Sequence, residues 1–175
     1  MQRVVMMTLA ALALLLPLAW AFQAAAESAD AEHPAAAAIV EFNKAVTERD
    51  METAIALLAE GSVQFNLHPA HPGMPEDHPL TEDMAKGWTV VSSILFPTTD
   101  SYERLVTIED VRADGELATV WTRTRTITRQ KGKTEPMVLE FSEMYLVVNK
   151  NDTGWRIAGN ATNRPVDSIV VGPTS

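Results

Sequence analysis

The chain has 175 residues, a formal net charge of −9 at neutral pH and no cysteine. An acidic chain repels phosphate groups, so we expect no nucleic acid among its partners and no affinity for anionic membrane surfaces. The lack of cysteine excludes disulfides, thiol chemistry and cysteine-based metal sites, and the length suits one domain held together by packing alone.

Residues 1–26 have the layout of a secretory signal peptide. One arginine near the start is followed by an apolar stretch rich in Ala and Leu, with no further charge until Glu27. Cleavage sites of the A-x-A type end at Ala21 and at Ala26, and we favour the second, which leaves residues 27–34 as a disordered lead-in. The alternative is an uncleaved membrane anchor, because the stretch is just long enough to span a bilayer. We therefore expect a secreted or periplasmic protein that is free of the membrane after cleavage.

Residues 35–58 predict two amphipathic helices. Apolar residues recur at helical spacing, Asp50 is a candidate N-cap for the shorter second helix, and Gly61 stands where a C-cap glycine is common. The expected buried faces are Ala35, Ile39, Phe42 and Val46 in the first helix and Met51, Ala54, Ile55 and Leu58 in the second.

A short strand and an irregular loop are expected next. Val63, Phe65 and Leu67 alternate with polar residues, which predicts a half-buried strand with these three side chains facing the core. Residues 68–79 contain four prolines and one glycine and predict an irregular loop. Thr81 is the candidate N-cap of a third helix after this loop. The apolar face of that helix is formed by Met84, Trp88, Val91 and Leu95.

The second half of the chain alternates apolar and polar residues in the manner of β-strands. Asp114-Gly115 is a strong signal for a two-residue hairpin turn. The expected strands cover residues 102–111, 117–128, 138–148 and 155–162, and residues 166–175 form a tail. Helices followed by such a run of antiparallel strands are typical of an α+β domain.

This order of elements resembles the nuclear transport factor 2-like superfamily, which includes the SnoaL-like and ketosteroid isomerase-like domains. Two local patterns carry the resemblance: IVEFNKAV at residues 39–46 running into DMETAIALL at residues 50–58, and GWRIA at residues 154–158. The resemblance implies an α+β fold over residues 35–165. In that fold a cone-shaped, curved antiparallel sheet wraps around the N-terminal helices and leaves one pocket at its open end.

What the pocket does varies within this superfamily. Members use it for isomerisation, cyclisation or dehydration, and many others only bind ligands or partners, so the fold alone does not assign a function. Many SnoaL-like members carry polar residues, often histidine, shortly after the Trp-Arg-Ile pattern. Counting with a period of two places Gly159 and Ala161 at those positions, which argues against catalysis.

The proline-rich loop is also rich in histidine and methionine. Its candidate metal ligands are His68, His71, Met74 and His78. Imidazole and thioether groups bind copper or zinc, but no helix presents these histidines at i and i+4, so we favour a plain solvent-exposed loop. A third possibility is that the loop lies over the pocket mouth, where His68 would touch a ligand because it directly follows the strand.

Glu143 is a charge on an otherwise apolar strand face. The other residues of that face are Leu139, Phe141, Tyr145 and Val147. A buried lone carboxylate is costly, so we expect Glu143 to be paired near the pocket wall, with Arg123 as its partner. Two registers are open: a five-residue turn would pair Arg123 with Glu143, whereas a two-residue Gly132-Lys133 turn would set Arg125 against Glu140. The alternative is a general base tuned by apolar neighbours.

Aromatic residues and a row of threonines complete the candidate sites. Trp88, Trp121 and Tyr145, with Arg123 and His68, are the residues that we expect to contact a ligand. The outer sheet face of this superfamily often pairs with a second subunit, so we expect a homodimer. The row expected to form that surface is Val120, Thr122, Thr124, Thr126 and Thr128.

We therefore expect an exported SnoaL-like domain that binds a small organic molecule in an aromatic-lined pocket, without a cofactor and without evident catalysis. The sequence contains no nucleophile elbow, phosphate-binding loop, zinc-protease motif or dinucleotide fingerprint. One alternative is a cofactor-independent isomerase, cyclase or dehydratase, in which Glu143 is the base and Tyr145 or Arg123 steadies developing negative charge. The other alternative is a copper- or zinc-binding protein that acts through the His/Met-rich loop.

Overall fold

The computed structural model describes residues 32–67, 79–150 and 154–164. The predicted signal peptide, the His/Met-rich loop and the tail fall outside these ranges. Within them, no helix combines the length and the apolar character that a membrane crossing requires.

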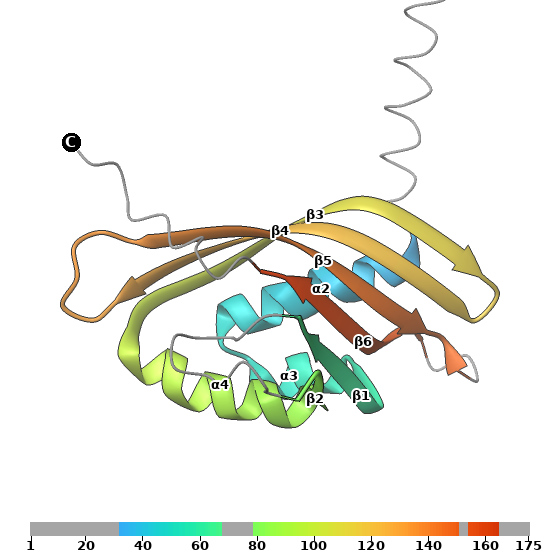
Figure 1. The fold of residues 1–175 in the computed structure, drawn as a ribbon, viewed down its shortest axis with the longest axis horizontal. Coiled ribbons are helices and arrows are strands. Elements are labelled where there is room, and N and C mark those ends of the chain that lie inside the picture. The colour runs from blue at the N-terminus through green and yellow to red at the C-terminus, as the bar shows by residue number, and fades with distance from the viewer. Residues whose placement is uncertain (1–31, 68–78, 151–153, 165–175) are drawn as a thin grey trace, which may run out of the picture.

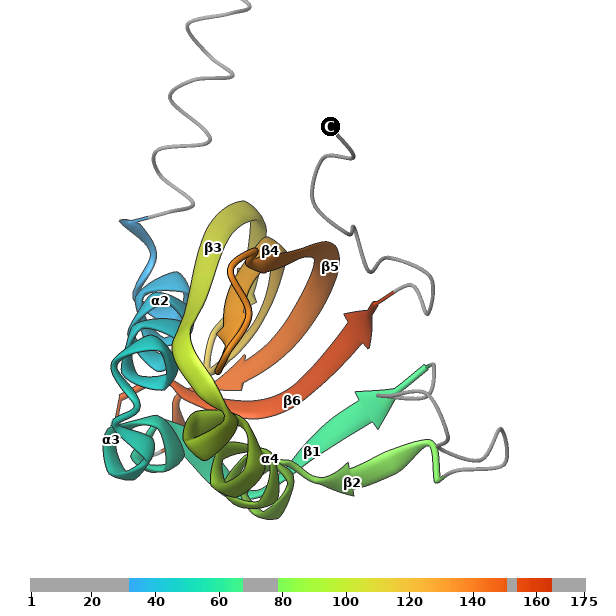
Figure 2. The ribbon, with the colours of Figure 1, turned by 90° about the vertical axis from the view of Figure 1, so that its left-hand side faces the viewer.

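Six strands form one curved sheet that does not close on itself, in the order β2-β1-β6-β5-β4-β3. They are β1 Leu58–Asn66, β2 Thr81–Asp83, β3 Thr99–Asp114, β4 Leu117–Gln130, β5 Met137–Val148 and β6 Arg156–Asn163. The pairing of β1 with β6 is parallel, and the other four pairings are antiparallel. The long strands β3, β4 and β5 arch over the helices (Figure 1), and the sheet curls so that its concave face looks toward them (Figure 2).

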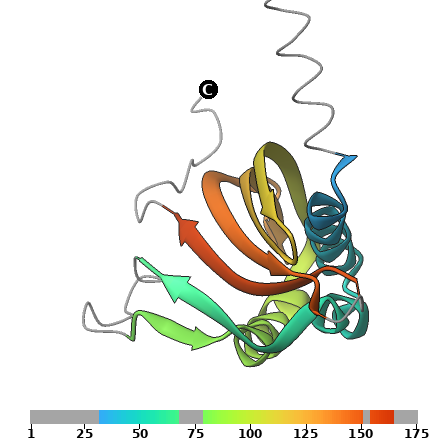
Figure 3. The same ribbon diagram turned by 90° about the vertical axis from the view of Figure 1, so that its right-hand side faces the viewer.

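In the described ranges, three helices lie on the concave side of the sheet: α2 Pro34–Glu48, α3 Met51–Ala56 and α4 Met84–Thr98. The predicted face of α2 is confirmed, since Ile39, Phe42 and Val46 are fully buried. His33 caps the start of α2 by accepting a hydrogen bond from the Ala35 amide. Seen from the opposite side, β1 and β2 lie below β6 and continue the curve toward α4 (Figure 3), so α2 and α4 occupy the inside of the curved sheet.

Two predicted helix boundaries are wrong. Gly61 does not cap α3, which ends at Ala56; it lies within β1, with φ of +74°, between the two registers that β1 makes with β6. Glycine suits this position because the left-handed backbone conformation costs it no steric strain. Thr81 does not cap α4, because residues 81–83 pair with β1; the cap is Asp83, whose Oδ1 accepts from the Lys86 amide at 2.8 Å.

The face of β1 is also the reverse of the predicted one. Phe65 is 38% exposed and Leu67 50% exposed, whereas Gln64 faces the interior, where its amide meets Asn160 and Thr162. Leu58, which is buried, and the outward-facing Phe65 are an odd number of residues apart and so fall on opposite faces of β1. The apolar alternation of Val63, Phe65 and Leu67 by itself did not show which of the two faces is buried.

The hairpin predicted at Asp114-Gly115 is confirmed. Asp114 pairs with Leu117, so the two-residue loop is Gly115-Glu116, and Gly115 has φ of +58°. A two-residue turn with glycine at its first central position matches the twist of the strands that it joins. The register of β4 against β5 is the one that a Gly132-Lys133 turn gives, because Arg125 pairs with Glu140 and Thr122 pairs with Glu143.

This register turns the threonine row of β4 inward. Val120 and the four threonines of the row are each 5% exposed or less, so they cannot form the dimer surface that we expected of them. Residues directly opposite each other in adjacent strands share a face, so the inward position of Glu143 fixes that of Thr122. The homodimer stays a prediction that requires a different surface.

Candidate functional site

A cavity of about 300 Å³ opens between α4 and the concave face of the sheet. Its apolar wall is formed by Trp88, Val91 and Leu95 of α4 and by Met137, Leu139 and Phe141 of β5. A pocket with aromatic and aliphatic walls and a few polar groups is the usual form of a small-molecule site, and this volume lies at the small end of such sites.

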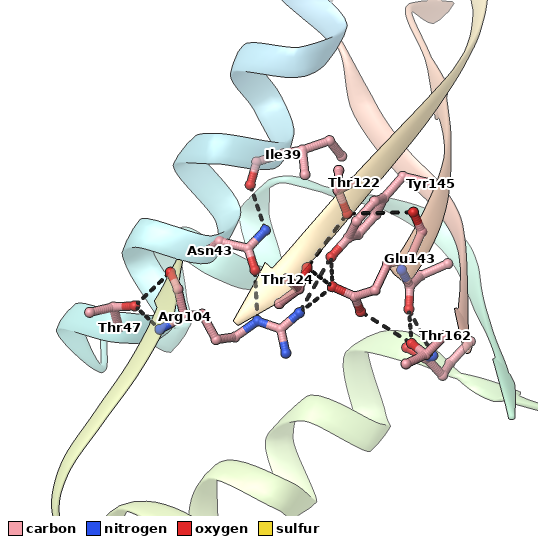
Figure 4. Close-up of polar contacts among 11 residues, drawn as sticks. Ile39, Asn43, Thr47, Arg104, Thr122, Thr124, Glu143, Tyr145 and Thr162 are labelled. Carbon is pink, nitrogen blue, oxygen red and sulfur yellow. Dashed lines mark hydrogen bonds and ion pairs between the residues drawn. The ribbon is translucent and has the colours of Figure 1, made fainter. Parts of the chain in front are cut away.

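A buried ion pair lies at the inner end of the cavity. Arg104 of β3 and Glu143 of β5 are 8% and 3% exposed, and Arg104 Nη2 lies 2.6 Å from Glu143 Oε2. Both side chains line the cavity and meet between α2 and the sheet (Figure 4). Because two charges taken out of water are costly unless paired and hydrogen-bonded, the neighbours of this pair decide whether it is tolerated.

Three hydroxyl groups complete the surroundings of Glu143. Oε2 accepts from Thr124 Oγ1 at 2.6 Å and from the Tyr145 hydroxyl at 3.0 Å, and Oε1 accepts from Thr162 Oγ1 at 3.1 Å. Burial raises the pKa of Tyr145 above its ordinary value, and the Glu143 charge raises it further. Tyr145 therefore stays protonated and donates a hydrogen bond to the carboxylate of Glu143, which accepts from four donors among the described residues.

Arg104 is fixed from the other side by α2 and by aromatic rings. Its Nε donates to Asn43 Oδ1 at 2.6 Å, while Asn43 Nδ2 donates to the Ile39 carbonyl oxygen. Its guanidinium carbon lies 5.3 Å from the ring centroid of Trp88 and 5.9 Å from that of Phe141. Burial alone would lower the pKa of Arg104, but the Glu143 carboxylate together with Tyr102 and Tyr145 outweighs it, and the pKa is raised. The guanidinium is therefore a permanent, oriented cation.

A β-bulge brings a second polar group into the same space. Leu146 pairs with Gly159 and Val147 pairs with Ile157, so Ala158 is an extra residue in β6. After this bulge Asn160 stands opposite Tyr145 and Thr162 stands opposite Glu143, on the inner face. The expectation that Gly159 and Ala161 occupy the inner positions is therefore wrong, and so is the argument against polar groups there.

Gln64 extends this polar group to the cavity surface. Its Nε2 donates to Asn160 Oδ1 at 2.8 Å and to Thr162 Oγ1 at 3.2 Å. Gln64, Thr162 and Glu143 all line the cavity, so a continuous chain of polar contacts runs from β1 through β6 to the ion pair. A bound molecule would meet this chain on one side and the apolar wall on the other.

Comparison with solved structures identifies the architecture. No protein-family model and no curated protein matches the chain. A ketosteroid isomerase-like protein from Erwinia carotovora atroseptica, 18% identical, superposes with a TM-score of 0.55 over 74% of this chain and 93% of its own. A nuclear transport factor 2-like superfamily protein from Salmonella enterica, 13% identical, superposes with a TM-score of 0.54 over 78% and 92%. The chain has the nuclear transport factor 2-like fold.

A third solved structure of this kind is a scytalone dehydratase-like protein from Novosphingobium aromaticivorans. It is 12% identical, with a TM-score of 0.59 over 73% of this chain and 79% of that one. At such low identity the likeness establishes the nuclear transport factor 2-like fold only. The chemistry of the cavity must be inferred from the residues that line it.

The structure brings together three of the predicted site residues. Glu143 lines the inner end of the cavity and accepts a hydrogen bond from Tyr145, which is buried beside it, and Trp88 forms part of the wall. Glu143 and Tyr145 thus lie on the concave face of the sheet, and Trp88 faces them from α4.

The structure places Trp121 and Arg123 on the outer face of β4, away from the cavity. Trp121 is 44% exposed, and Arg123 is ion-paired with Glu109 at 2.9 Å. The predicted contact between Arg123 and Glu143 is therefore wrong, because a shift of one residue in pairing moves a side chain to the opposite face. The true partner of Glu143, Arg104, comes from β3.

The predicted metal ligands lie outside the described residues. His68, His71, Met74 and His78 all fall within residues 68–78, as does the proposed contact of His68 with a ligand. Within the ranges that the structure does describe, no group of three or more His, Asp or Glu side chains is arranged to hold a metal ion.

Proposed function

We propose that this protein is exported and binds a small, partly apolar organic molecule in the cavity of its cone, without transforming it. The observation that carries the proposal is the composition of the cavity: an apolar wall from α4 and β5 faces a polar inner end whose ion pair is already complete. In such a cavity the apolar wall can bury the apolar part of a ligand, and the polar inner end can orient its polar group.

The surroundings of Glu143 support binding rather than proton transfer. A general base must be free to take a proton, but Oε2 of Glu143 accepts three hydrogen bonds, one of them from the Arg104 guanidinium. Tyr145 donates to the same oxygen and so is not directed at a ligand. Removing either charge would disrupt the inner end of the cavity, so both groups have a structural role.

A cofactor-independent isomerase or dehydratase is the second candidate, and one observation favours it. Oε1 of Glu143 accepts a single hydrogen bond from the described residues, that of Thr162, and Glu143 borders the cavity. This oxygen could take a proton from a bound molecule. The isomerase-like and dehydratase-like names among the structural neighbours agree with this candidate, although their low identity carries only the fold.

A thermal-shift screen of small organic acids, ketones and steroids tests the binding proposal. A true ligand present at 100 times its Kd stabilises the protein by about 2.7 kcal/mol and raises Tm by several degrees. Thr126→Phe places a ring in the cavity from its inner face and should abolish the shift, whereas Thr119→Phe, a matched change outside the cavity, should preserve it. An undiminished shift in Thr126→Phe would place the ligand elsewhere and overturn the proposal.

Analysis of the bound molecule after incubation separates the two candidates. We expect it to be recovered unchanged. Conversion by the wild-type protein that is lost in Glu143→Gln, with binding retained, would instead establish the enzyme.

Export rests on the sequence pattern of residues 1–26. N-terminal sequencing of protein recovered from the periplasm or the culture medium should give Glu27, or Phe22 if cleavage follows Ala21. Recovery of intact Met1 in the membrane fraction would contradict export as a soluble protein.

A further inference from the structure

We propose that the molecule bound in the cavity is an organic carboxylate, and that Arg164 holds its acidic group. This inference rests on the proposed binding function and names the class of ligand. It is carried by the charges that surround the cavity.

Among the described residues, four charged side chains line the cavity: Glu82, Arg104, Glu143 and Arg164. Arg104 and Glu143 neutralise each other in the buried ion pair. Glu82 is exposed and its carboxylate lies beside Gly87 in the first turns of α4, since a Cβ added at Gly87 would come within 3.3 Å of Glu82 Oε1. The amide groups at a helix N-terminus favour a nearby negative charge, so the charge of Glu82 is partly offset there.

Arg164 is the remaining charge, and it has no acidic partner among the residues that the structure describes. It directly follows β6, and none of the ion pairs among the described residues includes it. Its guanidinium carbon lies 5.9 Å from the ring centroid of Phe141, the same distance as that of Arg104 from the same ring. Two guanidinium groups thus gather around Phe141, and within the described part of the chain only that of Arg104 is neutralised by a carboxylate.

The surroundings of Arg164 suit the binding of an anion. Arg164 as a whole is exposed, but the protein atoms around its guanidinium remove part of its hydration and lower its pKa; the like charge of Arg104 acts in the same direction, while Tyr102 and Glu143 offset part of the effect. An added carboxylate would reverse this loss, because a guanidinium binds a carboxylate through two parallel, charge-assisted hydrogen bonds. The rest of the ligand would lie against Phe141, Leu139 and Trp88, which suits a compact aromatic or unsaturated acid.

A pair of probes of equal size tests the charge requirement. Cinnamate and cinnamamide have the same shape and differ in the acidic group, and their binding can be measured by isothermal titration calorimetry at low and high salt. We expect the wild-type protein to bind cinnamate at least about tenfold more tightly than cinnamamide, because hydrogen bonds to charged groups are worth more than neutral ones. Higher salt should weaken cinnamate binding more than cinnamamide binding.

Substitution of Arg164 assigns the effect to one residue. Arg164→Gln should weaken cinnamate binding about tenfold and leave cinnamamide binding within about twofold, and Arg164→Lys should recover part of the loss. Arg123→Gln is the control, because Arg123 is an arginine on the outer face of the sheet.

The outcomes distinguish this inference from the proposed function. If the two probes bind equally, or if Arg164→Gln affects neither, the carboxylate assignment is wrong, while ligand binding that is lost in Thr126→Phe still supports the cavity as the site. The same holds if every cavity ligand found in the thermal-shift screen is neutral. If neither probe and no screened molecule binds, both proposals fail.

Discussion

Replacing Arg104 with methionine should lower the free energy of unfolding by about 3–5 kcal/mol, because it leaves the carboxylate of Glu143 buried without its cation. Glu143→Gln should have an effect of similar size, since it leaves the Arg104 guanidinium in the same position. The double variant should lose less than the sum of the two single losses, because each single change already removes the interaction. Urea denaturation of the four proteins gives this double-mutant cycle.

The chain supplies a matched control for this cycle. Arg125 and Glu140 form a cross-strand ion pair at 3.5 Å on the outer face, with side chains that are 50% and 57% exposed. Arg125→Met and Glu140→Gln should each change the free energy of unfolding by less than about 1 kcal/mol, because water screens an exposed pair. If the buried and exposed pairs proved equally dispensable, the description of the cavity's inner end would be wrong.

Phe42→Ala should destabilise the protein by about 3–5 kcal/mol, the usual loss for deleting a fully buried aromatic ring. Phe42 is 0% exposed in the middle of α2, and its ring makes an edge contact with Trp88 at a centroid distance of 5.6 Å. The lost ring would leave a void behind the wall of the cavity, so ligand binding should weaken as well.

Val40→Ala is the matched control for this substitution. Val40 lies on the same helix but is 44% exposed, so its truncation should cost no more than about 0.5 kcal/mol. Equal effects of the two variants on the midpoint of urea denaturation would show that α2 does not pack on the sheet through the Phe42 face.

The buried face of α2 was predictable because three apolar residues at helical spacing leave only one way to bury them. The inward face of β5 was predictable around Leu139 and Phe141, which are separated by Glu140 and followed by Ser142. A signal for the partner of Glu143 was also present: Arg104 interrupts the inward alternation of Tyr102 and Val106, just as Glu143 interrupts that of β5. Two residues of opposite charge on the inward faces of strands in one small core are expected to pair with each other.

The faces of β4 and β6 could not be predicted in this way. In β4 the large aromatic residue, Trp121, faces outward and the threonines face inward, where Thr124 donates to Glu143. From hydrophobicity alone, Trp121 would be expected inside and the threonines outside. The hydrogen bond from Thr124 to the buried carboxylate of Glu143 accounts for the observed orientation. In β6 the bulge at Ala158 reverses the alternation, and Gly159 directly after it was a signal, because an isolated glycine within a strand often marks a bulge.

The parallel pairing of β1 with β6 has a consequence for how the protein folds. Gln64 and Asn160, which meet in the polar chain beside the cavity, are 96 residues apart in sequence. Such contacts can form only after a large part of the chain has been ordered, and domains dominated by them fold slowly. A chain emerging from the ribosome or from an export channel can form α2 and the β3–β4 hairpin early, but it acquires Thr162 and Arg164 last. The cavity is therefore among the last parts of the protein to form, because its lining is complete only when β6 and Arg164 have joined the sheet.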